Sequence, residues 1–445
     1  MFNKILDFSQ KKTVYLYENS LILQNIDGLI FLSICAVFLL STFMVSDTIG
    51  FCALVCGFLT VVKLFTKSGE RISCRGFEIW LLAYFMLVIV SLFGASLFIL
   101  SLKGFFKTLT YLIFYSSVVI YLKDNKEKIP FFMGLIGLCL GSQAIVGILQ
   151  NFSQVNEIST WQDVSRLNPE QVMTRVYGTL KPYNPNLLGG YLLIGTPSVF
   201  GVSAIKFFEK KKYLGLFWLL VGGLIVAATF LTGCRGAYLG VFGGFLAVIL
   251  ISFKFFWKQY KKAYLSIIGG CLTLITTAIL LLSSLRARII SIFAMRSDSS
   301  NSFRFNVYNS SLQMFKDNWL LGIGLGNQNF REIYGLYMIT GFDALSAYNI
   351  FLETAVESGI FALIAFVGFF ACIIYQGVKF IVKSDDMISS IIISTVVIST
   401  FVTAIHGMVD TVFFRPQLQF VFWFMIATGS VILNSKDNNK LSPIG

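Results

Sequence analysis

Twelve long apolar runs constrain this chain more than any other feature of its sequence. Each run has a length close to the about 20 residues that an α-helix needs to cross a bilayer. The runs lie at roughly 28–45, 49–66, 77–100, 106–122, 130–150, 185–205, 213–232, 237–253, 263–283, 348–378, 387–405 and 417–433. A β-barrel would instead show short segments of alternating polarity. The sequence therefore predicts an all-α, polytopic bundle of about twelve spans that contacts membrane lipids.

Composition excludes a water-soluble fold. Hydrophobic residues make up 56% of the chain and charged residues 13%, whereas soluble domains carry about 25% charged residues. The eight cysteines are scattered through the chain without CxxC pairs, so we interpret them as packing residues. The sequence predicts no disulfide framework, no metal site and no cofactor.

The basic residues indicate how the chain crosses the membrane. The 35 Lys and Arg exceed the 22 Asp and Glu, but they lie in short loops between apolar runs, which argues against a nucleic-acid partner. With the N-terminus inside, the cytoplasmic segments hold 22 of the 35 basic residues, as the positive-inside rule requires. We therefore predict an inner (plasma) membrane protein with both termini in the cytoplasm.

The arginines have a separate distribution. The outer segments hold 9 Arg and 4 Lys, which the positive-inside rule does not explain. Two outer loops are long, at 151–184 and 284–347, and long loops on a rigid scaffold often carry function. We predict one membrane domain, 28–433, between a cytoplasmic N-terminal segment, 1–27, and a cytoplasmic tail, 434–445.

Arg235 lies in a tight turn between two spans, flanked by Gly233 and Gly236. A cation at membrane depth is costly. A structural role, in which the side chain reaches lipid phosphates, is served equally well by Lys. The guanidinium suits bidentate binding of a phosphate or carboxylate, so we favour an anion-binding function.

The long outer loop 284–347 contains a second arginine motif around Arg304. Residues 302–316 have helical spacing, and Asp317-Asn318 ends the predicted helix. The run Gly322-Ile-Gly324-Leu-Gly326 follows no strand and lacks the complete dinucleotide-binding pattern. We therefore expect these glycines to shape the loop.

Polar residues recur at the start of the tenth span. Tyr348, Asn349, Glu353 and Glu357 are spaced as one stripe of a helix. Buried carboxylates need partners, and we expect the arginines of the outer loops to supply them. A purely structural role for this stripe and direct contact with a substrate both stay open.

Two shorter motifs complete the candidate residues. The single histidine, His406, precedes Asp410 and Arg415 in an outer turn; these three residues could form either a binding site or a salt-bridged cap. The run Pro182-Tyr-Asn184-Pro185-Asn186 resembles a helix N-cap with proline in the first turn.

Over roughly residues 180–380 the chain resembles the O-antigen ligase and polymerase superfamily. The resemblance rests on the Thr232–Ala237 turn around Arg235, the Arg304 helix that ends in Asp317 and Leu321-Gly-Ile-Gly324, and Asn349-Ile-Phe-Leu-Glu353 with Glu357-Ser-Gly359. A narrower resemblance is to a cyanobacterial branch described as bicarbonate (inorganic carbon) transporters. It rests on Arg175-Val-Tyr177, Asn184-Pro-Asn186, residues 297–304 and 345–348, and His406-Gly-Met-Val-Asp410 with Arg415-Pro416.

The superfamily implies transfer of a glycan from a lipid-linked diphosphate at the outer face, with arginines holding the diphosphate and a histidine acting as base. Arg235 and Arg304 match the arginines, but Tyr348 occupies the residue before Asn349 where the histidine is expected. A tyrosine, with a pKa of about 10, is a poor base at neutral pH.

An arginine-lined site also fits a small anion such as bicarbonate. The leading hypothesis is therefore bicarbonate uptake through an outer anion site. Its alternative is a glycosyltransferase that uses a lipid-linked glycan, so the sequence leaves open whether the protein is an enzyme. It also leaves the oligomeric state open. The candidate site residues are Asn184, Asn186, Arg235, Arg304, Tyr348, Asn349, Glu353, His406, Asp410 and Arg415.

Overall fold

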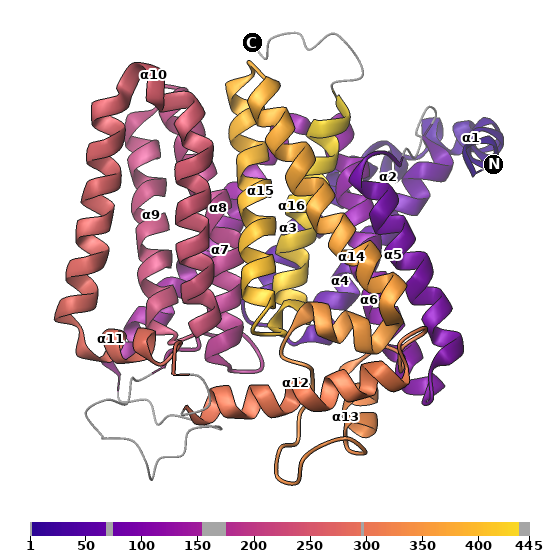
Figure 1. Ribbon diagram of the computed structural model, residues 1–445. Helices are drawn as coiled ribbons and strands as arrows, with labels where there is room; N and C mark the ends of the chain where they lie inside the picture. Colours follow the sequence, from indigo (N-terminus) through magenta and orange to yellow (C-terminus); the bar gives the residue numbers. More distant parts are fainter. Residues whose placement is uncertain (1, 68–73, 154–174, 295–297, 436–445) are drawn as a thin grey trace.

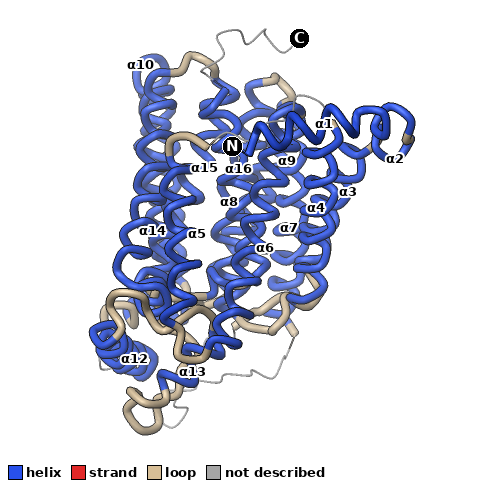
Figure 2. The backbone as a smooth tube through the Cα atoms, turned by 90° about the vertical axis from the view of Figure 1, so that its right-hand side faces the viewer, coloured by secondary structure: helices blue, strands red, loops and turns tan. Residues whose placement is uncertain are grey.

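The computed structural model describes residues 2–67, 74–153, 175–294 and 298–435, and this part of the chain is helical without any strand (Figures 1 and 2). The helices are α1 (Phe2–Asn19), α2 (Leu21–Gln24), α3 (Ile26–Ser41), α4 (Ser46–Thr66), α5 (Phe77–Ser91), α6 (Phe98–Asp124), α7 (Ile129–Phe152), α8 (Pro185–Phe208), α9 (Lys212–Leu231), α10 (Arg235–Leu281), α11 (Ser283–Ile290), α12 (Ser299–Asp317), α13 (Asn327–Tyr334), α14 (Ile350–Lys383), α15 (Met387–Gly407) and α16 (Pro416–Asn434).

These helices match the predicted spans. Ten of the described helices are long and apolar enough to cross a membrane. One of them, α10, has non-helical dihedral angles at Tyr260, where Figure 1 shows the chain turning back, so it makes two passes. With this second pass and with α3, a shorter apolar helix, the described helices make twelve passes. The prediction of an all-α, multi-pass membrane protein is confirmed.

Helix α16 forms the centre of the bundle. Every residue from Pro416 to Ile432 is buried, and the helix contacts α6, α8, α14 and α15. Its Phe420 and Phe424 meet Phe114 and Phe38 edge to face, a favourable geometry for aromatic pairs. By contrast, the second pass of α10 stands at the periphery, where lipid would cover its exposed apolar side chains.

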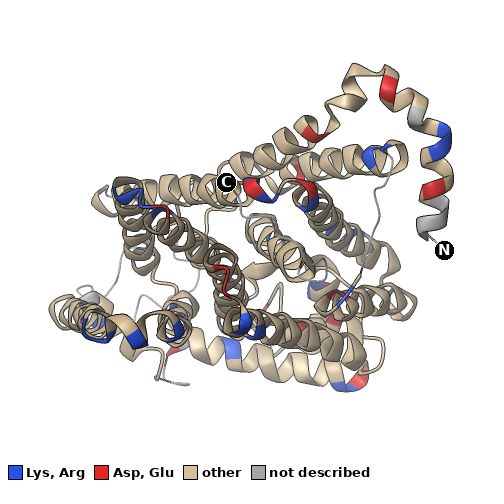
Figure 3. Ribbon diagram, turned by 90° about the horizontal axis from the view of Figure 1, so that it is seen from above, with Lys and Arg blue, Asp and Glu red and all other residues tan. Residues whose placement is uncertain are grey.

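The two ends of the bundle differ. In Figures 1 and 2, α1, α2 and the bend of α10 lie at the upper end, whereas α11, α12 and α13 cover the lower end. Seen from above, most of the ribbon is free of charged residues (Figure 3). The region 284–347, predicted as a loop, thus carries three helices. Both predicted long loops reach the lower end, although residues 154–174 of the first lie outside the described residues.

The glycine run has the predicted structural role. Gly322, Gly324 and Gly326 all have positive φ, which residues with a Cβ rarely adopt. The loop runs beside a break in α14: Ile323 donates its backbone N–H to the carbonyl of Val356 (2.9 Å). At the break Gly359 has φ 79°, and a Cβ there would stand 2.1 Å from the carbonyl oxygen of Leu320. The loop therefore packs directly on the short part of α14 that precedes this break.

Candidate functional site

Helix α12 organises the lower end of the molecule. It lies across the ends of the spans (Figure 1), and its N-cap is Asp298, whose side chain accepts a hydrogen bond from the backbone N–H of Asn301 (2.9 Å). The predicted helix over 302–316 is confirmed, and it ends at Asp317 with Asn318 as its C-cap. Both arginines of the predicted anion site contact this helix or belong to it.

Arg235 holds the first turn of α12. It is the first residue of α10, after the N-cap Cys234 and two residues beyond Gly233, whose φ is 63°. Its Nη1 and Nη2 reach the two carboxylate oxygens of Asp298 at 2.8 and 2.7 Å, and Nη1 also donates to Asn301 Oδ1 at 2.8 Å. Burial by itself would raise the pKa of Asp298, but the Arg235 guanidinium lowers it overall. The bidentate partner of this arginine is therefore a carboxylate of the same chain.

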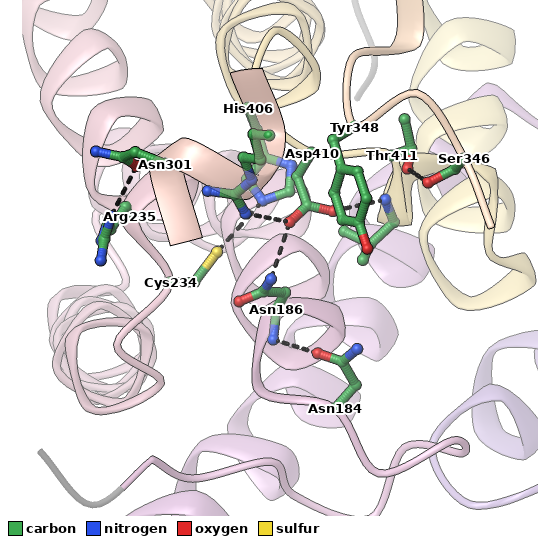
Figure 4. A network of polar contacts seen from close by, with 12 residues as sticks. Asn184, Asn186, Cys234, Arg235, Asn301, Ser346, Tyr348, His406, Asp410 and Thr411 are labelled. Carbon is green, nitrogen blue, oxygen red and sulfur yellow. Dashed lines mark hydrogen bonds and ion pairs between the residues drawn. The ribbon is translucent and has the colours of Figure 1, made fainter. Parts of the chain in front are cut away.

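Arg304 points into a second cluster, centred on Asp410. Arg304 Nη2 lies 3.5 Å from Asp410 Oδ2, and the same oxygen accepts a hydrogen bond from Asn186 Nδ2 at 2.9 Å (Figure 4). Asn186 in turn accepts from Arg175, which also donates through Nε to the carbonyl of Thr232 (2.9 Å). Residues distant in sequence thus converge on one buried carboxylate, because α8, α12 and the α15–α16 turn meet at this end.

The electrostatics of this end are dominated by arginine. Burial lowers the pKa of Arg175 from its ordinary value. Burial and the nearby Arg235 and Arg175 lower the pKa of Arg288, on α11, to about 10. Four arginines, Arg175, Arg235, Arg288 and Arg304, therefore act on one region. Such a concentration of positive charge favours an anion.

Tyr348 forms one wall beside Arg304. Its φ is 51°, and the Arg304 guanidinium carbon lies 5.7 Å from the centre of its ring, within the range of a cation–π contact. Burial raises the pKa of Tyr348 to about 12, so the phenol is neutral at neutral pH. This tyrosine is a poor candidate for a general base.

His406 contacts Cys234, one of the cysteines that we interpreted from the sequence as packing residues. Its Nε2 lies 3.6 Å from the sulfur of Cys234, and both residues are buried. Burial alone would raise the pKa of the Cys234 thiol, but the hydrogen bond to His406 lowers it. The histidine, placed by sequence only near Asp410, is thus held between the Arg235 turn and Asp410 (Figure 4).

Other candidate residues have mainly structural contacts. Asn184 is exposed and caps α8, as the sequence predicted, by accepting the N–H of Asn186 (2.8 Å). Asn349 caps α14 and donates to the carbonyl of Met408 (3.0 Å).

Two expectations about partners need correction. The suggested cap of His406, Asp410 and Arg415 does not form: Asp410 pairs with Arg304, and Arg415 makes no ion pair within the described residues. The 3₁₀ turn η6 (Val412–Phe414) separates Arg415 from Asp410 and places it at the start of α16. Nor does any arginine of the described loop residues pair with Glu353 or Glu357. Backbone N–H groups bind those carboxylates instead, at Ala347 (3.1 Å) and Gly326 (2.8 Å).

Several members of the site were absent from the candidate residues. Arg175, Cys234, Asp298 and Lys107 all contact or face the residues above. A lysine inside an apolar run, as Lys107 is, was a detectable signal, because ionisable residues in spans usually face a cavity or a partner. The N-cap role of Asp298 was detectable only with the start of α12 known. Among the described residues no group of three or more metal-ligating side chains occurs.

Comparison with known families gives one match. Residues 198–367 match the family described as O-antigen ligase. The matched segment includes Arg235, Arg304 and Tyr348, whereas Arg175, His406 and Asp410 lie outside it. No curated protein matches the chain. The fold is that of a multi-pass helical membrane protein, and the match over residues 198–367 supports the resemblance to the O-antigen ligase superfamily but not to its bicarbonate-transporter branch.

Proposed function

We propose that this protein transfers a glycan from a lipid-linked diphosphate carrier, at the membrane face covered by α11, α12 and α13. The observation that carries the proposal is the convergence of arginines on one end of the bundle, with a buried histidine and carboxylate among them. A transferase of this kind must stabilise the negative charge that develops on the departing diphosphate, and fixed guanidinium groups serve that purpose.

Arg304 is the arginine best suited to hold the diphosphate. It makes one long contact to Asp410 (3.5 Å), and its side chain is 16% exposed. Within the described residues its Nε and Nη1 donate no hydrogen bond, so both remain for an anion. Asn186 and Arg175 hold Asp410 in place, and Tyr348 supports the guanidinium from one face. Arg235 serves by fixing the start of α12.

The proposal extends to membrane orientation. The Lys-rich turns at the upper end favour a cytoplasmic location for that end under the positive-inside rule. Both termini would then be cytoplasmic, in the inner membrane, and residues 28–433 would form one domain. The arginine site would face the outer side, where lipid-linked glycans would be its partners.

Cysteine labelling tests this orientation. In a Cys74→Ser background, which removes an exposed thiol, Leu336→Cys near α13 should react with an impermeant maleimide in intact cells. Asp385→Cys, in the exposed turn between α14 and α15, should react only after the cells are opened. The reverse pattern would place the arginine site in the cytoplasm and remove the proposal.

Activity is tested with purified protein in lipid nanodiscs. We expect transfer from a polyprenyl-diphosphate-linked glycan to a saccharide acceptor, and loss of transfer in Arg304→Ala. Uptake of labelled bicarbonate into proteoliposomes is measured in parallel. Uptake that depends on Arg304, with no glycan transfer, would overturn the proposal in favour of the transport hypothesis.

A further inference from the structure

A small cavity lies beside the arginine site, where α6, α14 and α16 meet the glycine loop. Its volume is about 60 Å³, room for about four water molecules at about 15 Å³ each. Its lining includes Tyr84, Lys107, Asn327, Glu353, Glu357 and Trp423. Gly104 allows the loop to close one side, because a Cβ there would stand 2.7 Å from the backbone of Leu325.

Two carboxylates line this cavity, and each has one oxygen that accepts no hydrogen bond from the described residues. Glu353 and Glu357 are 2% and 8% exposed. One oxygen of each accepts a backbone N–H, from Ala347 and Gly326 respectively. Within the described residues the second oxygen of each has no hydrogen-bond partner. Since the residues are one helical turn apart on α14, both oxygens serve the same small space.

Lys107 supplies a cation to the same space. It stands on α6, and the charges acting on its ammonium group come mainly from Arg415, Glu357 and Glu353. In the described parts of the chain it makes no hydrogen bond or ion pair. Ionisable side chains at membrane depth are costly and usually serve a substrate or ion path. A lysine that makes no ion pair with the described residues and faces two carboxylates across a cavity therefore indicates a ligand site.

The cavity and the arginine site share walls. Ser346 and Thr411 are joined by a 2.6 Å hydrogen bond between their hydroxyl groups. The next residues, Ala347 and Tyr348, face opposite sides: the N–H of Ala347 binds Glu353, and the ring of Tyr348 lies under Arg304. Likewise Asp410 binds Arg304, while Phe413 and Phe414 line the cavity. A ligand in the cavity would therefore adjoin an anion held by Arg304.

We propose that this cavity binds a hydroxyl group of the saccharide acceptor and that Glu353 takes its proton, an inference that rests on the proposed glycosyl transfer. The acceptor oxygen forms a bond to the anomeric carbon as the bond from that carbon to the carrier phosphate breaks. The hydroxyl proton goes to Glu353, and the lipid diphosphate leaves with the bonding electrons. Glu357 and Lys107 hold the acceptor, the carboxylate accepting and the ammonium donating a hydrogen bond.

This assignment accounts for the position of Tyr348. A glycosyl transfer to a hydroxyl group requires a proton acceptor, and the phenol, with its raised pKa, is unsuited to that role. Glu353 is the cavity carboxylate nearer the start of α14, and its charge acts on Tyr348, whose ring contacts Arg304. Glu357, one turn deeper, suits the holding role.

The test compares Glu353→Gln and Glu357→Gln with Glu332→Gln, an exposed carboxylate on α13. Glutamine keeps an oxygen for the backbone N–H, so the loop contact survives. With the lipid-linked donor we expect Glu353→Gln to lower kcat by about 10²–10⁴-fold, and Glu357→Gln to raise the acceptor KM about tenfold or more. Formate should partly restore Glu353→Ala, which a merely structural role does not predict.

A binding experiment without the lipid-linked donor distinguishes failure of the proposed glycosyl transfer from failure of the proposed acceptor site. Methyl glycosides should raise the thermal stability of the wild type and of Glu332→Gln, but not of Glu357→Gln or Lys107→Met. If the wild type transfers no glycan but this pattern holds, glycosyl transfer fails while the saccharide site stands. If the wild type transfers glycan and both cavity variants retain normal transfer and binding, the cavity holds only solvating water and this inference is overturned.

Discussion

Two arginine–aspartate pairs, each with one member at α12, have different structures. The pair of Arg235 with Asp298 is bidentate, at 2.7 and 2.8 Å, and the arginine side chain is 8% exposed. The pair of Arg304 with Asp410 is a single contact of 3.5 Å, and its arginine side chain is twice as exposed, at 16%. Both pairs lie at the first two turns of α12. In the first pair both terminal nitrogens of the arginine bind the carboxylate, whereas in the second only one does.

This difference separates a structural arginine from one available to a ligand. A guanidinium whose two terminal nitrogens already hold a carboxylate has little capacity for a further anion. Arg235 therefore fixes the start of α12, and α12 carries Arg304 to the site. We expect substitutions of the first pair to reduce stability and substitutions of the second to reduce activity.

The largest expected effect is on activity in Arg304→Ala. Loss of a fixed positive group at a developing anion costs about 10²–10³-fold in rate. Arg304→Lys keeps the charge but loses the planar two-donor fork, so we expect it to lie nearer to alanine than to the wild type. Transfer kinetics in nanodiscs measure both. Wild-type rates in Arg304→Lys would show that bidentate binding is not needed.

The next effect is on stability in Asp298→Ala. Breaking one side of a buried ion pair costs about 3–5 kcal/mol; since the Asp298 side chain is 20% exposed, we expect a loss of about 3 kcal/mol. Asp298→Asn, the matched control, keeps the N-cap acceptor and isolates the charge. Thermal unfolding and limited proteolysis of the region 284–347 report the change. If neither variant loosens this region, Arg235 does not hold α12.

Lowering the pH should weaken the same Arg235–Asp298 pair, with a smaller effect on stability than Asp298→Ala. The pKa of Asp298 is lowered in the folded protein, so the pair contributes its full stability above the unfolded pKa of about 3.9. That contribution is lost as the pH falls below this value through the folded pKa. Proteolysis of the region 284–347 by pepsin should therefore accelerate only below about pH 4. Asp298→Asn should remove that step, and a step in the variant equal to that of the wild type would assign it to another group.

Tyr348→Phe should have the smallest effect. Its hydroxyl group could donate one hydrogen bond to a ligand, worth about 0.5–1.5 kcal/mol, and the ring that supports Arg304 is kept. We expect a loss of activity of about tenfold at most. Near-complete loss with normal protein level would make the phenol catalytic and would remove Glu353 from that role.

The sequence predicted the secondary structure of this region better than its contacts. Helical spacing located α12, Asn184 and Asn349 were found at the starts of helices, and the glycines were assigned to loop geometry. These features depend on neighbouring residues, which a sequence displays directly. The partners of Asp410 were not predicted, because Arg304 is 106 residues away and Asn186 is 224 residues away.

The sequence by itself determined the all-α, multi-pass class of the protein and showed that its arginines gather in a few connecting segments. Length and hydropathy suffice there, because every span must satisfy its own backbone within lipid. Only the tertiary structure decided that Asp298 forms an ion pair with Arg235 and that Asp410 forms one with Arg304. It also decided that Lys107 lines the same cavity as Glu353 and Glu357. Ion pairs and cavities form between whichever helices pack together, and the spacing of residues along a chain does not specify that packing.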